Sequence, residues 1–219
     1  MSIIHRTTMK PTKLELLTPW LPAQPWYTGT ADAPVLSRTG GFRLDDPEGA
    51  VGIEFMVVTD ESGAHPVSYH VPLSYRAERL DGVEESALVG TSEHGVLGLR
   101  WIYDGTHDPV VVAGLLALLQ GRGEPQMQSV SDTPDPSVAF AFTGGAVASG
   151  VESTTVTHGK DGTRLAITTS TGGPVTVDVT RLLGAAVTTD ALGHVTAGWH
   201  APDGTDHRDV FAVLRGATA

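Results

Sequence analysis

The stretch VGIEFMVVTDESGAHPVSYHVPLSYR, residues 51–76, decides the fold class, because it reads as two strands joined by a turn. Residues 51–59 and 66–76 are rich in Val and other residues that favour strands, and the polar run 60–65 separates them. Such a pattern predicts an antiparallel hairpin. Residues 87–92 and 96–103 follow the same pattern and predict a second hairpin.

A helix signal follows these hairpins in DPVVVAGLLALLQGRG, residues 108–123. Asp108 can accept the free amide protons at the helix start, and Pro109 suits the first helical position. Gly121 or Gly123 can supply the left-handed residue that closes the helix. The segment is apolar nearly all round, so we expect it to be deeply buried. A shorter helix is predicted at residues 11–17, closed by Pro19.

The remainder of the chain reads as a meander of short strands. The predicted strands are residues 138–142, 151–158, 164–170, 174–181, 193–199 and 208–215, with turns at KDGT (160–163) and PDGT (202–205). The expected fold is α+β, with a predominantly antiparallel β-sheet and few helices. Three regions are expected: 1–124, a Pro-rich linker at 125–136 (PQMQSVSDTPDP), and a β-rich region at 137–219 that could also form one compact domain with the first.

Composition excludes several classes of function. The 219 residues carry 14 Lys and Arg against 25 Asp and Glu, and this net charge of −11 argues against a nucleic-acid or anionic-membrane partner. The absence of cysteine excludes disulfides, thiolate zinc sites and thiol nucleophiles. No apolar run approaches the roughly 20 residues of a membrane span, and the first ten residues contain no signal-peptide core. We therefore expect a soluble, cytoplasmic protein.

Motifs for catalysis, metals or cofactors are not apparent in the chain. His194, His200 and His207 are six and seven residues apart, which does not match a helical metal-binding pair. No phosphate-binding loop and no nucleophile elbow is found. The sequence thus predicts no metal site, no cofactor and no catalytic residue of a recognised type.

Several segments nevertheless follow a familiar order: WLPAQPWYTG (20–29), YHVPLSYR (69–76) and SALVGTSEHGVLGLRWIYDGTHDPV (86–110), followed by the apolar helix. This series resembles the N-terminal cap region of bacterial maltokinases and related aminosugar kinases, which phosphorylate sugars with ATP. The resemblance covers about the first 125 residues and implies a cap-like N-terminal half. The second half, whose pattern predicts a β-meander, matches more loosely.

The chain also departs from those kinases in ways that bear on function. The nucleotide-binding segment, the strand lysine and the helical lobe with a His-Gly-Asp catalytic loop do not occur in these 219 residues. Phosphoryl transfer depends on such positioned cations, metal ligands and a base. Pro25 and the Gly29–Thr30–Ala31 run also replace basic positions of the family. Paired carboxylates on a barrel, which a glucan-branching enzyme needs, are not indicated either.

The first functional hypothesis is therefore a non-catalytic, stand-alone maltokinase-cap-like protein. It would act as an interaction or regulatory module in maltose, trehalose or glucan metabolism, with a protein partner or a sugar ligand. The candidate binding residues are Tyr75, Arg76, Arg100, Trp101 and Asp104. Arg76 and Arg100 could equally form ion pairs with local carboxylates.

Two alternatives remain open. The second hypothesis is a carbohydrate-binding module for α-glucans or maltooligosaccharides that uses the same aromatic residues, although Trp101 could simply pack in the core. The third is an enzyme of unrecognised type that uses Asp104 with His107 or His94, which requires these side chains to converge in a pocket. The sequence does not indicate an oligomeric state.

Overall fold

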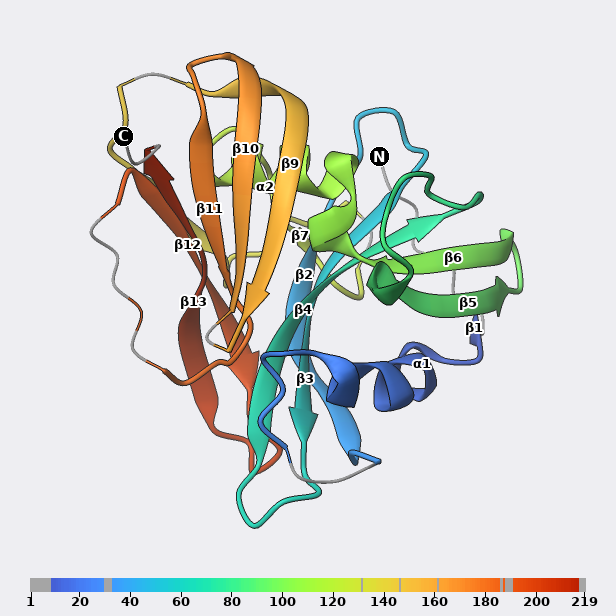
Figure 1. Ribbon diagram of the computed structural model, residues 1–219. Coiled ribbons are helices and arrows are strands. Elements are labelled where there is room, and N and C mark those ends of the chain that lie inside the picture. The colour runs from blue at the N-terminus through green and yellow to red at the C-terminus, as the bar shows by residue number, and fades with distance from the viewer. Residues whose placement is uncertain are drawn as a thin grey trace.

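The computed structural model describes residues 9–29, 33–130, 132–145, 147–160, 162–185, 187 and 191–216. These residues form one 13-stranded sheet with two α-helices (Figure 1). The main path of the sheet runs β1-β5-β6-β4-β3-β2-β12-β13-β11-β10-β9, and β7 and β8 pair with β2 and β12. Every strand pairing in the described part is antiparallel. The predicted α+β fold with mainly antiparallel sheet and few helices is confirmed.

The first half contains six strands, two α-helices and three short 3-10 helices, labelled η1 to η3, within its described residues. In chain order they are β1 (Met9–Lys10), α1 (Lys13–Trp20), η1 (Leu21–Ala23), β2 (Leu36–Leu44), β3 (Gly52–Asp60), β4 (Val67–Arg76), η2 (Glu85–Ala87), β5 (Leu88–His94), β6 (Gly98–Asp104), η3 (Gly105–His107) and α2 (Pro109–Leu119). Both predicted hairpins are present, as β3–β4 and β5–β6.

The second half consists of strands. They are β7 (Gln126–Met127), β8 (Ala139–Phe142), β9 (Ser149–Gly159), β10 (Gly162–Thr171), β11 (Val175–Thr180), β12 (Gly193–His200) and β13 (Asp206–Gly216). All six strands predicted in this half are found, within a few residues of the expected limits.

β2 is the strand on which the two halves meet, and the sequence does not reveal it. It pairs with β3 on one side and with β7 and β12 on the other. The register shifts between Arg38 and Gly40, and Gly41 has a φ of +127°. A Cβ on Gly41 would lie 2.3 Å from the Phe55 carbonyl oxygen, so glycine is required for this close approach.

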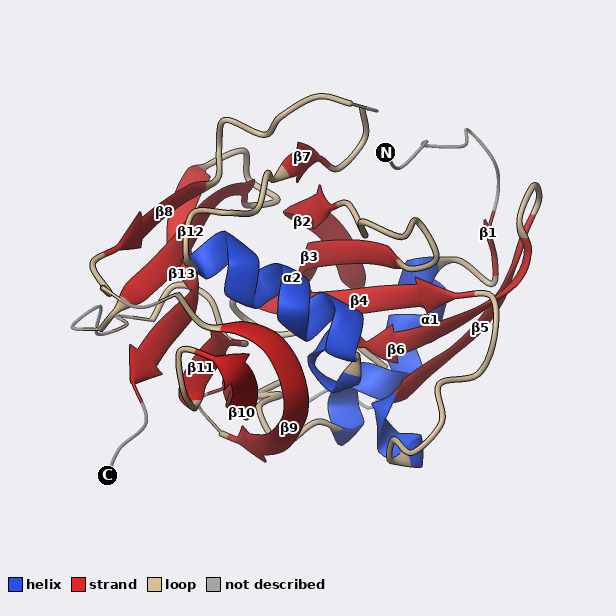
Figure 2. Ribbon diagram, turned by 90° about the horizontal axis from the view of Figure 1, so that it is seen from above, coloured by secondary structure: helices blue, strands red, loops and turns tan. Residues whose placement is uncertain are grey.

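The apolar helix α2 begins as predicted. The Asp108 side chain accepts a hydrogen bond from the Val110 amide at 3.0 Å, Pro109 occupies the first helical position, and Gly121 follows the helix with a φ of +71°. Figure 2 shows α2 crossing the centre of the molecule between β9–β11 and β2–β4. Six of its residues are buried, as its nearly uniform hydrophobicity requires.

Helix α1 corrects one local prediction, since it includes Pro19 instead of ending before it. A capping box between Thr12 and Glu15 fixes its start. Leu17 and Trp20 are buried on either side of Pro19. We attribute the continuation of the helix to this burial, which outweighs the hydrogen bond that proline removes.

The central strands separate two hydrophobic cores, because alternate residues of β3 face opposite sides. Ile53, Phe55 and Val57 belong to the α2-side core, which also contains residues of α2 and of the second-half strands. Met56 and Val58 belong to the α1-side core, together with residues of α1, β4, β5 and β6.

The halves share both the sheet and the α2-side core. β7 lies within the Pro-rich segment 125–136 and pairs with β2. Part of the predicted linker therefore belongs to the sheet. The ring centroids of Phe42 on β2 and Phe211 on β13 are 6.0 Å apart. None of the described helices is long and apolar enough to cross a membrane.

Candidate functional site

A cleft of about 780 Å³ opens between α1 and strands β2–β4. We call it the α1 cleft and define it by six of its lining side chains: Lys13, Arg38, Arg43, Glu54, Tyr75 and Arg100. Glu54 reaches the cleft because it alternates with Ile53 and Phe55 along β3, and therefore faces α1 instead of α2.

Glu54 is the centre of a polar cluster at the base of the α1 cleft. Its residue is 2% exposed, and its carboxylate accepts three hydrogen bonds. Lys13 Nζ donates to Oε2 at 2.5 Å, the Tyr75 hydroxyl donates to the same oxygen, and Gln128 Nε2 donates to Oε1 at 2.7 Å. Burial by itself would raise the pKa of Glu54, but Lys13 and these hydrogen bonds hold it below its ordinary value. Glu54 is therefore a fixed, ionised acceptor.

Cationic side chains predominate among the charged residues that line the α1 cleft. Four cationic side chains stand there against the single carboxylate of Glu54, in a chain whose net charge is −11. Arg43 Nε donates to the Met127 carbonyl at 3.3 Å, and Arg100 Nη2 donates to the Leu97 carbonyl at 2.6 Å. The buried atoms Arg43 Nη2 and Arg100 Nε have no hydrogen-bond partner among the described residues. The α1 cleft thus offers donors suited to an anionic ligand.

The structure does not bring the five candidate residues from the sequence together in one site. Tyr75 and Arg100 line the α1 cleft, and Trp101 is half-buried on β6 with the Arg79 guanidinium carbon 5.8 Å from its ring centroid. Arg76 instead makes a two-bond ion pair with Asp108, at 2.6 and 2.7 Å. The sequence left open whether Arg76 binds a ligand or pairs with a carboxylate of the chain, and the structure shows the ion pair.

Asp104 is buried in a second polar cluster at the end of β6. Arg181 Nη2 donates to both Asp104 oxygens, at 2.8 and 2.6 Å, and neither side chain is more than 1% exposed. Arg181 also donates from Nε to Thr163 Oγ1 at 2.8 Å, and its guanidinium carbon lies 4.9 Å from the Trp26 ring centroid. The ion pair joins residues 77 positions apart.

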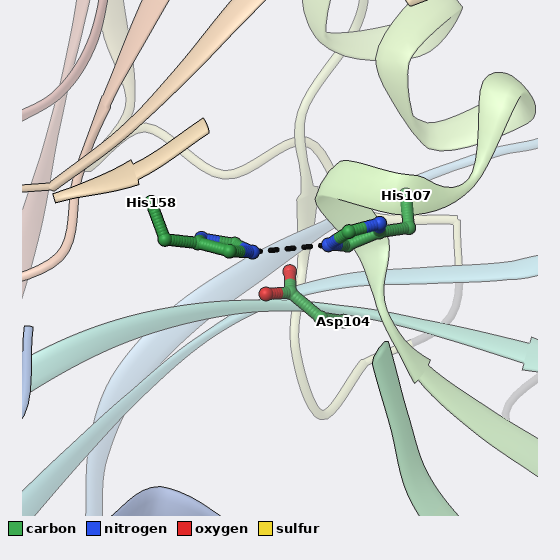
Figure 3. A group of neighbouring side chains, drawn as sticks. All are labelled: Asp104, His107 and His158. Atoms are coloured by element: carbon green, nitrogen blue, oxygen red, sulfur yellow. Dashed lines mark hydrogen bonds between the residues drawn. The ribbon is translucent and has the colours of Figure 1, made fainter. Parts of the chain in front are cut away.

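Two histidines lie beside Asp104 (Figure 3). His107 Nε2 and His158 Nε2 are 3.0 Å apart, and His158 Nδ1 is 2.9 Å from Thr163 Oγ1. Burial is the main cause that lowers the pKa of both histidines. Within the described residues, the ligand atoms of Asp104, His107 and His158 lie within 4.8 Å of one another, as a metal site requires.

The third sequence hypothesis is thus met in one respect, because Asp104 and His107 converge. His94 does not take part, since it lines the α1 cleft and its Nδ1 accepts hydrogen bonds from the Val96 and Leu97 amides. His158 was missed because it lies 51 residues from His107 and no local spacing connects them.

Fold and site together define a mainly antiparallel β module with a cation-rich cleft on its α1 face. Residues 20–108, less than half of the 219-residue chain, match the family model of the maltokinase N-terminal cap domain. The resemblance found in the sequence is confirmed over this segment. No curated protein matches the chain. The matched segment runs from the last residue of α1 to Asp108, the residue that caps α2.

Proposed function

We propose that this chain is a non-catalytic, maltokinase-cap-like binding module that takes a phosphorylated sugar in the α1 cleft. It would act as an interaction or regulatory module in maltose, trehalose or glucan metabolism, in the cytoplasm. The observation that supports this most directly is the set of four cationic side chains around Glu54 in an otherwise acidic protein.

The chemistry of the α1 cleft suits both parts of such a ligand. Guanidinium groups bind phosphate oxygens through charge-assisted hydrogen bonds, and Arg43 and Arg100 each have a buried donor atom without a partner in the described part of the chain. Glu54 and Gln128 provide the acceptor and donor that sugar hydroxyls need. A positive cleft in a negatively charged protein also concentrates anions where they bind.

The same groups favour a non-catalytic role. Glu54 is the one carboxylate that lines the α1 cleft, and three donors already hold it as an anion. It is therefore poorly suited to act as a general base, because a base must give up such donors to take a proton.

Calorimetric titration tests the ligand class directly. We expect heat of binding with glucose 6-phosphate, weaker binding with inorganic phosphate, and none with maltose at millimolar concentration. Arg100→Ala and Arg43→Ala should each weaken binding about 10- to 100-fold, which is the loss expected for one charge-assisted hydrogen bond. Arg208→Ala, an exposed arginine of β13, is the matched control.

The titrations also distinguish the alternatives. Equal binding of maltose and glucose 6-phosphate, unaffected by Arg100→Ala, would overturn the anion site in favour of a neutral carbohydrate-binding module. Binding of none of the three ligands would overturn a small-molecule role. The regulatory part is tested separately, by adding the protein to a sugar kinase or trehalose-forming enzyme, where an unchanged rate counts against it.

A further inference from the structure

We propose that His107, His158 and Asp104 form a binding site for a divalent transition metal ion, of which Zn²⁺ is the best fit. The site is separate from the α1 cleft, since none of the three side chains lines that cleft. It lies where η3, which precedes α2, meets β9 of the second half.

The distance between the two imidazoles suits a shared metal ion. Zinc binds histidine nitrogen at roughly 2.0–2.1 Å, so two nitrogens 3.0 Å apart subtend an angle of about 95° at the metal. A small rotation of either ring opens this to the tetrahedral value. In Figure 3 the two Nε2 atoms point at each other, and the Asp104 carboxylate lies beside the line that joins them.

The surroundings of His158 fix which nitrogen can bind. Its Nδ1 is 2.9 Å from Thr163 Oγ1, and Thr163 is itself held by Arg181 Nε. A hydrogen bond at Nδ1 orients the ring and leaves Nε2 for the metal, which is the usual outer-shell arrangement of a histidine ligand. Two nitrogens that face each other also need a proton between them, and a metal ion would take the place of that proton.

Asp104 provides the third ligand, and its ion pair moderates the affinity. Its Oδ1 accepts hydrogen bonds from Thr106 and Arg181, whereas within the described residues Oδ2 accepts from Arg181 alone. Oδ2 therefore retains a lone pair for a metal. Because the Arg181 cation already neutralises much of the carboxylate charge, we expect micromolar binding instead of the tighter binding of a structural zinc site.

A metal at this position would connect segments far apart in the chain. His107 and His158 belong to different halves of the sequence, so an ion bound to both stabilises the folded state relative to the unfolded chain. The melting temperature should therefore rise with added Zn²⁺.

The experiment uses the full chain without a polyhistidine tag, dialysed against a chelator and titrated with Zn²⁺ by calorimetry. We expect one ion per chain, micromolar affinity and a higher melting temperature. His107→Ala and His158→Ala should each weaken binding at least 10-fold and abolish the thermal shift. His65→Ala, which removes an exposed histidine between β3 and β4, should leave both unchanged.

Cobalt provides a second readout that does not depend on stability. Co²⁺ in the proposed site should give the intense visible absorption of low-symmetry coordination, and this signal should be lost in both variants. Zn²⁺ affinity unchanged by His107→Ala and by His158→Ala would overturn the site, as would binding no tighter than millimolar. If one variant fails to fold, the other decides, because each removes one of the two imidazoles.

Discussion

Replacing Arg181 by methionine leaves the Asp104 carboxylate buried without its cation. Neither side chain is more than 1% exposed, so water cannot compensate for the loss. Removing one partner of such a pair costs about 3–5 kcal/mol. Arg181 also loses its hydrogen bonds to Thr163 and Thr106 and its contact with the Trp26 ring, so we expect a value near the upper end, about 4–5 kcal/mol.

Urea denaturation followed by circular dichroism measures this cost. At about 2–4 °C per kcal/mol for a chain of this size, the melting temperature should fall by roughly 8–20 °C. The double variant Arg181→Met/Asp104→Leu should recover part of the loss, because it removes the unpaired charge as well.

Arg164→Met is the matched control for Arg181→Met. Arg164 pairs with Asp178 at 2.7 Å, but its side chain is 64% exposed, and such a pair contributes about 0–1 kcal/mol. If Arg181→Met costs no more stability than Arg164→Met, the buried pair does not hold the two halves together.

Two further predictions concern His70 and Asp108. Burial, followed by the charge of Arg181, lowers the pKa of His70 to about 3, whereas an unfolded histidine titrates near 6.5, so the unfolded state binds more protons at acid pH. The stability linked to His70 is complete above about pH 7 and falls by about 2 kcal/mol between pH 7 and pH 5. Denaturation of His70→Leu at these two pH values should show a smaller fall in unfolding free energy than the wild type. Asp108→Ala should cost about 2–4 kcal/mol by denaturation, because Asp108 caps α2 and pairs with Arg76.

A control variant completes the first experiment, and a conservative variant completes the second. His65→Leu, at an exposed position, should retain the full pH dependence, and equal slopes for His65→Leu and His70→Leu would contradict the first prediction. Asp108→Asn keeps an oxygen that can accept from the Val110 amide but loses the charge facing Arg76. The stability of Asp108→Asn should lie between those of the wild type and Asp108→Ala. If Asp108→Asn is as unstable as Asp108→Ala, the cap makes no measurable contribution to stability.

Local signals allowed much of the fold to be predicted. Alternating β-favouring residues around polar turns identified both hairpins and the meander, and Asp108, Pro109 and Gly121 delimited α2. β2 was not predicted because Gly40 and Gly41 argue against a strand in isolation. Its register depends on a bulge and on backbone contact with β3, which only the folded sheet provides.

The candidate sites could be predicted only in part for a similar reason. Tyr75 and Arg100 were found through the family resemblance, and both line the α1 cleft. Glu54 and Arg43 become neighbours of that cleft only when β2, β3 and α1 assemble. Asp104 stood out as polar at a strand end, but its burial depends on Arg181, 77 residues later.

The matched segment ends at Asp108, and this position has a consequence for how such a cap could pass between proteins. A cut after Asp108 separates the capping carboxylate from α2, removes Arg181 from Asp104, and leaves Phe42 and Phe55 without the helix and strands that cover them. A gene fusion that carried residues 20–108 alone would transfer a recognisable sequence but only part of a folding unit. In this chain, the α2-side core and the Asp104–Arg181 pair extend beyond the segment that sequence comparison recognises.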